Sequence, residues 1–203
     1  QHAHIVQAHD AGEEAGQHYL VMELIEGKNL SEVVRQNGAL SVNAACEVIS
    51  QAAKGLEYAH ENGLIHRDIK PSNLMLALST DRKTNQVTSA VVKILDLGLA
   101  RLRAHGEKSD SDLTTEGQII GTLDYMAPEQ GGNSSDVDIR ADIYSLGATL
   151  YYLLAGEPPY SAFAKLPILQ RITAISQNEP PALQSRRPDV PQGVAAIVHR
   201  MIA

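Results

Sequence analysis

The stretch GLIHRDIKPSNLML, from Gly63 to Leu76, constrains the fold of this chain more than any other. Apolar residues flank a polar centre, and Pro71 excludes a helix that runs through the middle of the stretch. A carboxylate, an ammonium group and a carboxamide follow one another at Asp68, Lys70 and Asn73. We therefore expect these three side chains on a short loop that is held at both ends by buried segments.

Apolar periodicity predicts a helix that leads into this loop. Residues on one face of it recur at spacings of four and three, namely Ala45, Ile49, Ala52, Leu56 and Ala59. Ser41 is placed to cap the start of this helix, and Gly63 to end it. A second segment, from about Asp138 to Ala155, is apolar almost all round, which predicts a buried helix. Two further helices are expected around residues 168–175 and 194–201.

Strands are predicted before and after the loop. The segment from His18 to Gly27, HYLVMELIEG, has the pattern of a strand, and its expected hairpin partner comprises Ile5, Val6 and Ala8. Two more strands, near 74–78 and 90–95, are joined by the polar segment STDRKTNQVTS. The last of them ends at Asp96, in KILDLGLAR, so that a second carboxylate is presented at a strand end.

Composition excludes some classes of function. The chain has 203 residues, 43% of them hydrophobic, which is enough to bury a sizeable core. Its net charge of −7 argues against nucleic acid as the main partner, because phosphate backbones are bound by clustered Lys and Arg. The longest mostly apolar run, 143–155, is shorter than the ~20 residues that cross a bilayer. We therefore expect a soluble, cytoplasmic segment with no signal peptide and no membrane contact of its own.

Cysteine and histidine suggest no separate site. The single cysteine, Cys46, lies among alanines in the first predicted helix and is expected to be a buried structural thiol. The histidines near the start of the chain have no second group of ligands at a spacing typical of zinc sites.

The loop chemistry favours transfer of a phosphoryl group. Mg²⁺ bound to a nucleotide takes only one or two protein carboxylates, because it keeps waters and phosphate oxygens. Asn73 and Asp96 are suitable oxygen ligands if the fold brings the two loops together. Asp68 would then be free to orient and deprotonate an attacking hydroxyl, and Lys70 would neutralise charge on the transferred group.

These motifs together resemble the signature of protein kinases. HRDIKPSN is similar to the catalytic loop, with Ile69 where leucine is usual. DLG at 96–98 resembles the DFG motif, and APE stands at 127–129. The APEQ sequence and Leu97 resemble the eukaryotic-like (Hanks-type) serine/threonine kinases of bacteria. The resemblance implies an α+β, protein-kinase-like fold, mainly helical, and a serine/threonine protein kinase that uses ATP with Mg²⁺ or Mn²⁺.

The resemblance also implies roles for individual residues. Asp68 resembles the catalytic base, and Lys70 the lysine that contacts phosphate. Asn73 and Asp96 resemble the metal ligands, Arg67 the anchor of an activation-loop phosphate, and Thr122 the threonine that contacts the catalytic loop and shapes the substrate site. Structural support is implied for His66, for Asp142 beneath the HRD turn and for Glu129 of the APE motif. For Asp142 the alternative is an acid that complements the dipole of its own helix, and both roles can coexist.

The adenine site is implied by a second set of residues. Met22 to Ile25 resemble the gatekeeper and hinge, so that main-chain groups of Glu23 and Ile25 would bond the adenine. Met75 and Leu95 would pack on its face. The alternative is that Met22, Met75 and Leu95 are simply core residues.

The resemblance is incomplete at both ends. No G-x-G-x-x-G loop, no V-A-I-K-like lysine and no arginine partner for Glu129 occurs in the chain. We expect residues 1–27 to form the end of a small lobe with the hinge, and residues 28–203 to form the large lobe. We also expect the kinase activity of this fragment by itself to be weak. The expected partner is a protein with a serine or threonine acceptor, and self-association for autophosphorylation is compatible with the resemblance. The alternatives are a pseudokinase scaffold and a small-molecule phosphotransferase.

The polar segment 100–121 generates the first testable prediction. It exceeds the ~12 to 15 residues that structureless loops usually reach, and this length favours a function. A phosphate on Thr114 or Thr115 would add ~1.5 to 2 negative charges that Arg67 could bind, thereby ordering the loop. We expect mass spectrometry of the active protein to find this phosphate, and Thr114→Val with Thr115→Val to lower activity. An unmodified active protein whose double variant is equally active would contradict the prediction.

Overall fold

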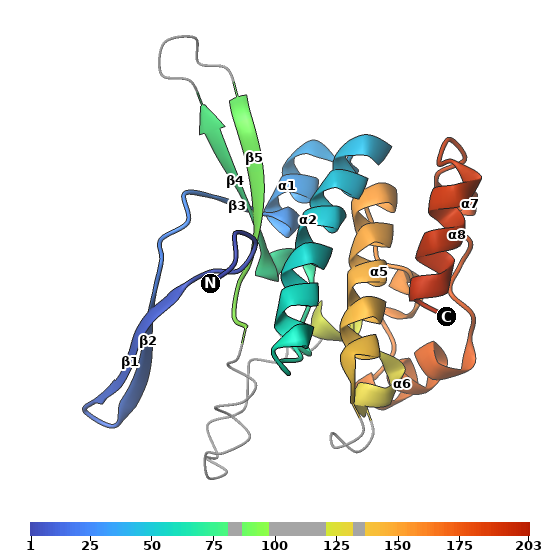
Figure 1. The fold of residues 1–203 in the computed structure, drawn as a ribbon. Helices are drawn as coiled ribbons and strands as arrows, with labels where there is room; N and C mark the ends of the chain where they lie inside the picture. The colour runs from blue at the N-terminus through green and yellow to red at the C-terminus, as the bar shows by residue number, and fades with distance from the viewer. Residues whose placement is uncertain (81–86, 98–120, 132–136) are drawn as a thin grey trace.

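The computed structural model describes residues 1–80, 87–97, 121–131 and 137–203 (Figure 1). The strands are β1 (Ala8–Glu14), β2 (Gln17–Met22), β3 (Gly27–Asn29), β4 (Leu74–Thr80) and β5 (Val87–Ile94). The helices are α1 (Leu30–Asn37), α2 (Val42–Glu61), α5 (Ile139–Ala155), α6 (Ile168–Gln177), α7 (Leu183–Arg186) and α8 (Gln192–Met201). Short 3-10 turns cover Pro71–Asn73, Pro128–Gly131 and Ser161–Phe163. The predicted α+β class, with helices predominating, is confirmed.

The core is centred on α5, which lies between α2 and α8 (Figure 1). Most side chains of α5 are buried, as the nearly continuous apolar pattern predicts, and Leu153 and Leu154 are fully buried. The Asp138 side chain accepts a hydrogen bond from Arg140 N and caps the start of α5. Gly156 ends the helix with a left-handed φ of 80°.

Helix α2 begins and ends close to the predicted residues. The Ser41 hydroxyl accepts a hydrogen bond from Ala44 N, and Gly63 follows the helix with a φ of 70°. The predicted apolar face of α2 is buried, and it packs against α5 and β5. Cys46 is half-buried, whereas the sequence predicted a buried thiol, because it lies beside this face and not on it.

The first hairpin differs from the prediction in its partner strand. β1 and β2 are antiparallel, with Ala8 opposite Met22 and Glu14 opposite Gln17. The prediction that Ile5 and Val6 pair with β2 is wrong. These two residues lie beside the end of β5, where Val6 N donates to Ile94 O at 2.9 Å. The predicted strand to Gly27 ends at Met22. Glu23 N still donates to Gln7 O, but Gln7 N donates to the Glu23 carboxylate and not to a backbone carbonyl.

The second sheet has the order β3-β4-β5 and is antiparallel throughout. Its long hairpin extends into the polar segment that was predicted to be a connection, because ladder hydrogen bonds join backbone groups and do not need apolar side chains. Helix α1 was not predicted: it is short, and only Leu30 and Val34 anchor it in the core. None of the described helices is long and apolar enough to cross a bilayer.

The contact between α5 and α8 generates a prediction about stability. A Cβ atom on Gly147 would lie 2.5 Å from Met201 Cβ and 2.8 Å from Ile202 Cγ2. We expect Gly147→Ala to lower the free energy of unfolding by about 1–3 kcal/mol, because overpacking outweighs the gain in helix propensity.

Gly193, in the first turn of α8, is the matched control, since a Cβ there meets no atom within 4 Å. Gly193→Ala should leave the free energy of unfolding unchanged or raise it by up to about 1 kcal/mol. Urea unfolding of both variants measures the difference, and equal stability of the two would refute the packing argument.

Candidate active site

The loop after α2 is held from below by a buried carboxylate. Asp142, in the first turn of α5, is fully buried. Its Oδ1 accepts a hydrogen bond from Arg67 N at 2.7 Å, and its Oδ2 accepts one from His66 N at 2.9 Å. Oδ2 also lies 2.8 Å from His60 Nε2, at the end of α2. Arg67 has a φ of +66°, a strained backbone for a residue with a side chain, so these contacts hold an unfavourable turn in place.

His66 connects the catalytic loop to the end of β5. Asp68 N donates to His66 Nδ1 at 3.3 Å, which leaves Nε2 as the protonated nitrogen of a neutral ring. Nε2 then donates to Leu95 O at 2.7 Å. The buried imidazole therefore joins Asp68 to the residue that precedes Asp96.

Three polar side chains of the loop gather with one from a distant segment. Lys70 Nζ lies 2.9 Å from Asp68 Oδ2 and donates to Thr122 Oγ1 at 2.9 Å. Asn73 Nδ2 donates to Asp68 Oδ2 at 3.0 Å and to Asp68 O at 2.7 Å. The structure thus brings four of the predicted residues into one cluster: Asp68, Lys70, Asn73 and Thr122. Lys70 and Thr122 are 52 positions apart in the sequence.

The two candidate metal ligands lie on adjacent segments. Leu95 N donates to Asn73 O at 2.9 Å, which sets the residue before Asp96 beside the catalytic loop. Asn73 uses its amide nitrogen on Asp68, so its Oδ1 is the atom that suits a metal, and Asp96 exposes its carboxylate at a φ of +60°. Both side chains have hard oxygen atoms, the type of ligand that divalent cations take, so the residue types present fit a divalent metal. Among the described residues no cluster of three or more His, Cys, Asp or Glu side chains could hold a metal.

Lys93 connects two of the predicted adenine residues, Glu23 and Met75. Its Nζ lies 2.5 Å from Glu23 Oε1, and this hydrogen bond is the main reason why the pKa of Glu23 lies below its ordinary value. Lys93 is paired in register with Met75 on β4, which in turn lies opposite Asn29 of β3. The segment that follows Met22 is therefore attached to β5, the neighbour of the strand that carries Met75.

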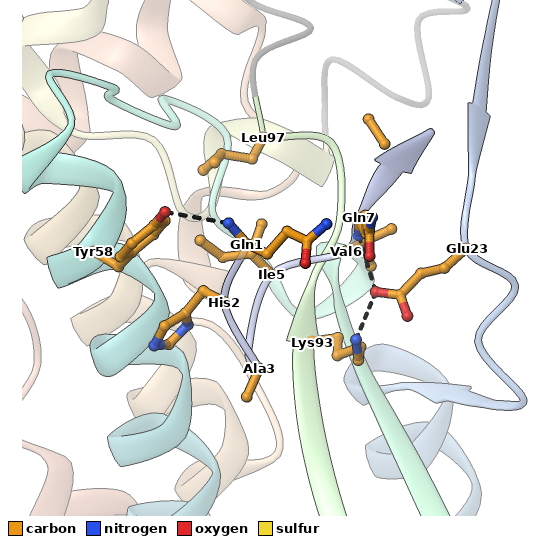
Figure 2. A pocket seen from close by; sticks show the side chains of 11 residues that line it. Gln1, His2, Ala3, Ile5, Val6, Gln7, Glu23, Tyr58, Lys93 and Leu97 are labelled. Atoms are coloured by element: carbon orange, nitrogen blue, oxygen red, sulfur yellow. Dashed lines mark hydrogen bonds and ion pairs between the residues drawn. The ribbon is translucent and has the colours of Figure 1, made fainter. Parts of the chain in front are cut away.

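A cavity lies beside the pair formed by Lys93 and Glu23 (Figure 2). It has a volume of about 550 Å³ and is lined by N-terminal residues together with Glu23, Tyr58, Lys93 and Leu97. Of the predicted adenine residues only Glu23 lines it; Met22, which is 36% exposed, and Ile25, Met75 and Leu95 do not. The catalytic loop is likewise absent from its lining.

The segment from Gly121 to Gly131 is anchored by contacts that the sequence analysis missed. Asp124 forms an ion pair with the buried Arg171 of α6, and burial raises the pKa of this carboxyl despite the guanidinium. Gln130 donates from Nε2 to Arg67 O at 2.8 Å. The motif APEQ did include Gln130, but Arg171 gave no signal beyond its place in a periodic helix.

The remaining predicted residues are less constrained. Glu129 is exposed and forms no ion pair with any residue in the part of the chain that the structure describes. Thr114, Thr115 and Gly98 lie outside the described residues.

Comparison with known proteins identifies a family and several relatives for this chain. The protein kinase domain family matches residues 1–202. Serine/threonine-protein kinase PknB of Mycobacterium tuberculosis is 40% identical over 164 residues, which cover 79% of this chain and 24% of the relative. PknB of Mycolicibacterium smegmatis is 34% identical over 207 residues, covering 100% of this chain and 30% of the relative.

Solved structures show the same fold. The kinase domain of Mycobacterium tuberculosis PknI is 28% identical, with a TM-score of 0.67 over 100% of this chain and 65% of that domain. The structure of Rad53 residues 1–466 in complex with AMP-PNP matches with a TM-score of 0.73, over 100% of this chain and 46% of that chain. Its sequence identity is 24%, so this match supports the fold alone. The chain spans about a quarter of the length of the first of these curated relatives. With a family match over nearly every residue, the chain belongs to the protein kinase domain family.

Proposed function

We propose that the protein transfers the γ-phosphoryl group of ATP to serine and threonine hydroxyls of protein substrates. The observation that carries this proposal is the position of Lys70 Nζ, 2.9 Å from both Asp68 Oδ2 and Thr122 Oγ1. A carboxylate that can accept the hydroxyl proton thus lies beside a cation that can stabilise negative charge on the transferred group. Phosphoryl transfer depends on this positioning and charge stabilisation more than on covalent chemistry.

In the proposed reaction Asp68 orients the acceptor hydroxyl and takes its proton. Asn73 Nδ2 holds Oδ2 of this carboxylate at 3.0 Å, and the carboxylate is 44% exposed, so a substrate hydroxyl can reach it. Asn73 Oδ1 and Asp96 would hold the divalent cation, Mg²⁺ or Mn²⁺. When bound, the cation would neutralise charge on the ATP phosphates.

A protein substrate is favoured by the segment around Thr122. This residue contacts the catalytic loop through Lys70, and Asp124 attaches the same segment to α6 through Arg171. An ordered segment beside the acceptor position gives an extended peptide a surface to bind, which a small-molecule phosphotransferase does not require. Arg67 stays our proposal for the group that binds a phosphate on Thr114 or Thr115.

At the other end of the site, we assign the adenine to main-chain groups of Glu23 and Ile25, with Met22 as gatekeeper. Met75 and Leu95 would contact the adenine face. This assignment corresponds to a division of the chain into the end of a small lobe with the hinge, 1–27, and a large lobe, 28–203. Self-association for autophosphorylation and a cytoplasmic location of this segment belong to the same proposal.

The substitution Asp68→Asn tests the catalytic base. Because general-base and orienting contributions are typically ~10²- to 10⁴-fold, kcat should fall by about that factor while ATP binding stays nearly intact. The complete protein encoded by the gene is assayed for phosphate transfer from labelled ATP, and binding is measured by calorimetry. Asp189→Asn is the control, since Asp189 is an exposed carboxylate that pairs with the nearby Arg187.

Two outcomes would contradict the assignment. Equal kcat in wild type and Asp68→Asn would remove Asp68 from the reaction. A wild-type protein that binds ATP and transfers no phosphate would favour the pseudokinase scaffold instead.

The substitution Thr122→Val tests the contact with Lys70. The change removes the hydroxyl that accepts the hydrogen bond from Nζ, and hydrogen bonds to charged groups contribute about 1.5–3 kcal/mol. We expect kcat/KM for a protein substrate to fall by about tenfold or more, and Thr122→Ser to restore most of it. If valine and serine behave alike, the hydroxyl is not used and this part of the proposal fails.

A further inference from the structure

Gln130 forms a bridge between two backbone groups that belong to different parts of the site. Its Nε2 donates to Arg67 O at 2.8 Å, and its Oε1 accepts from Ala127 N at 3.1 Å. One partner is therefore in the HRD turn and the other in the APE motif. The bridge spans 63 positions of sequence.

The peptide group that Gln130 contacts is the one that precedes Asp68. The carbonyl of this peptide is Arg67 O, and its N–H belongs to Asp68 and donates to His66 Nδ1 at 3.3 Å. The orientation of this peptide plane determines where the Asp68 side chain leaves the backbone. Gln130 thus acts on the backbone of Asp68 without touching its carboxylate.

This peptide follows a residue in the left-handed region, Arg67, with a φ of +66°. Such a conformation persists only where surrounding contacts over-determine it. Asp142 holds the N–H of Arg67, at 2.7 Å, and Gln130 holds its carbonyl. The turn is therefore fixed on both sides of the strained residue, from α5 on one side and from Pro128–Gly131 on the other.

The chemistry of both contacts requires a carboxamide of this length. A backbone N–H needs an acceptor and a backbone carbonyl needs a donor, and a primary amide provides both at its tip. Glutamate would keep the hydrogen bond from Ala127 N, but it would place a carboxylate oxygen, which cannot donate a hydrogen bond, beside Arg67 O. Methionine would fill the same space and make neither hydrogen bond.

We propose that Gln130 is a positioning residue: it couples the docking of the APE segment, residues 127–130, on the catalytic loop to the orientation of Asp68. This proposal rests on the proposed function, because it assigns Asp68 as the base. The APE segment contacts the catalytic loop here and, eight residues earlier, through Thr122 and Lys70. When residues 127–130 leave the loop, Arg67 O loses its donor and the base loses its orientation.

The test compares Gln130→Met and Gln130→Glu with Gln51→Glu in the complete protein encoded by the gene. Gln51 is a matched control because it makes the same kind of bridge between α2 and β5, without contact to the HRD turn or the APE motif: Oε1 accepts from Val92 N at 2.9 Å, and Nε2 donates to Ala90 O at 3.2 Å. Misplacement of a reacting group by about 1 Å can cost on the order of 10²-fold in rate. We expect both Gln130 variants to lose about 10- to 100-fold in kcat, with KM for ATP within about twofold of wild type. Gln51→Glu should lower stability without lowering kcat.

A double variant separates positioning from a general structural effect. If Gln130 acts through Asp68, then Gln130→Met should cost less than about twofold in an Asp68→Asn background, because the two changes are not additive. The proposal is overturned if Gln130→Met keeps wild-type kcat, or if it costs the same factor with and without Asp68.

Amide hydrogen exchange gives a readout that does not need activity, which distinguishes failure of this proposal from failure of the proposed function. The Ala127 N–H should lose protection in Gln130→Met and keep it in Gln51→Glu, even if the wild-type protein transfers no phosphate. Unchanged protection of Ala127 in Gln130→Met would overturn the bridge itself.

Discussion

The buried carboxylate of Asp142 is the contact on which the geometry of the site depends. A charge removed from water is costly unless hydrogen bonds compensate it, and this one is fully buried. Two backbone N–H groups of the HRD turn and the ring nitrogen of His60 surround it. The position of Asp142 in the first turn of α5 adds the favourable field of a helix N-terminus. A helix that is buried over most of its length therefore holds the turn that carries Asp68.

From this turn the order of the site extends outward through backbone groups. The His66 ring connects the turn to Leu95 O, and Asn73 O receives Leu95 N, so the end of β5 is attached to the loop at two points. The backbone position of Asp96 is consequently fixed by the residue that precedes it, although its own carboxylate is exposed. Lys70 and Asn73 both contact the side chain of Asp68, which gives one loop a cation, an anion and an amide in mutual contact. The loop therefore presents the Asp68 carboxylate between a cation and an amide donor.

The sequence was sufficient where a long, regular apolar period marks a helix, but it missed the short helix α1, in which only Leu30 and Val34 are buried. The period of Ala45 to Ala59 predicts α2, and the predicted cap at Ser41 is present at its start. Contacts between distant segments could not be predicted in this way, because no local period records them. The pairing of Val6 with Ile94 rather than with β2 is one example, and the bond from Gln130 to Arg67 O is another. The kinase motifs indicated which polar residues to expect at the site, and His66 and Asp142 as their support, whereas the contacts of His60, Gln130 and Arg171 became visible only in the fold.

The segment from Thr122 to Gln130 has three polar contacts that depend on one another. Thr122 accepts from Lys70, Asp124 pairs with Arg171, and Gln130 donates to Arg67 O. Removing one partner of a buried ion pair is strongly destabilising, so Arg171 strongly favours the arrangement in which Asp124 is docked. Because these contacts lie within nine consecutive positions, displacement at Asp124 moves the residues on either side of it. The three contacts should then form and break together, and the orientation of the catalytic loop becomes a property of the whole docked segment rather than of Asp68 alone.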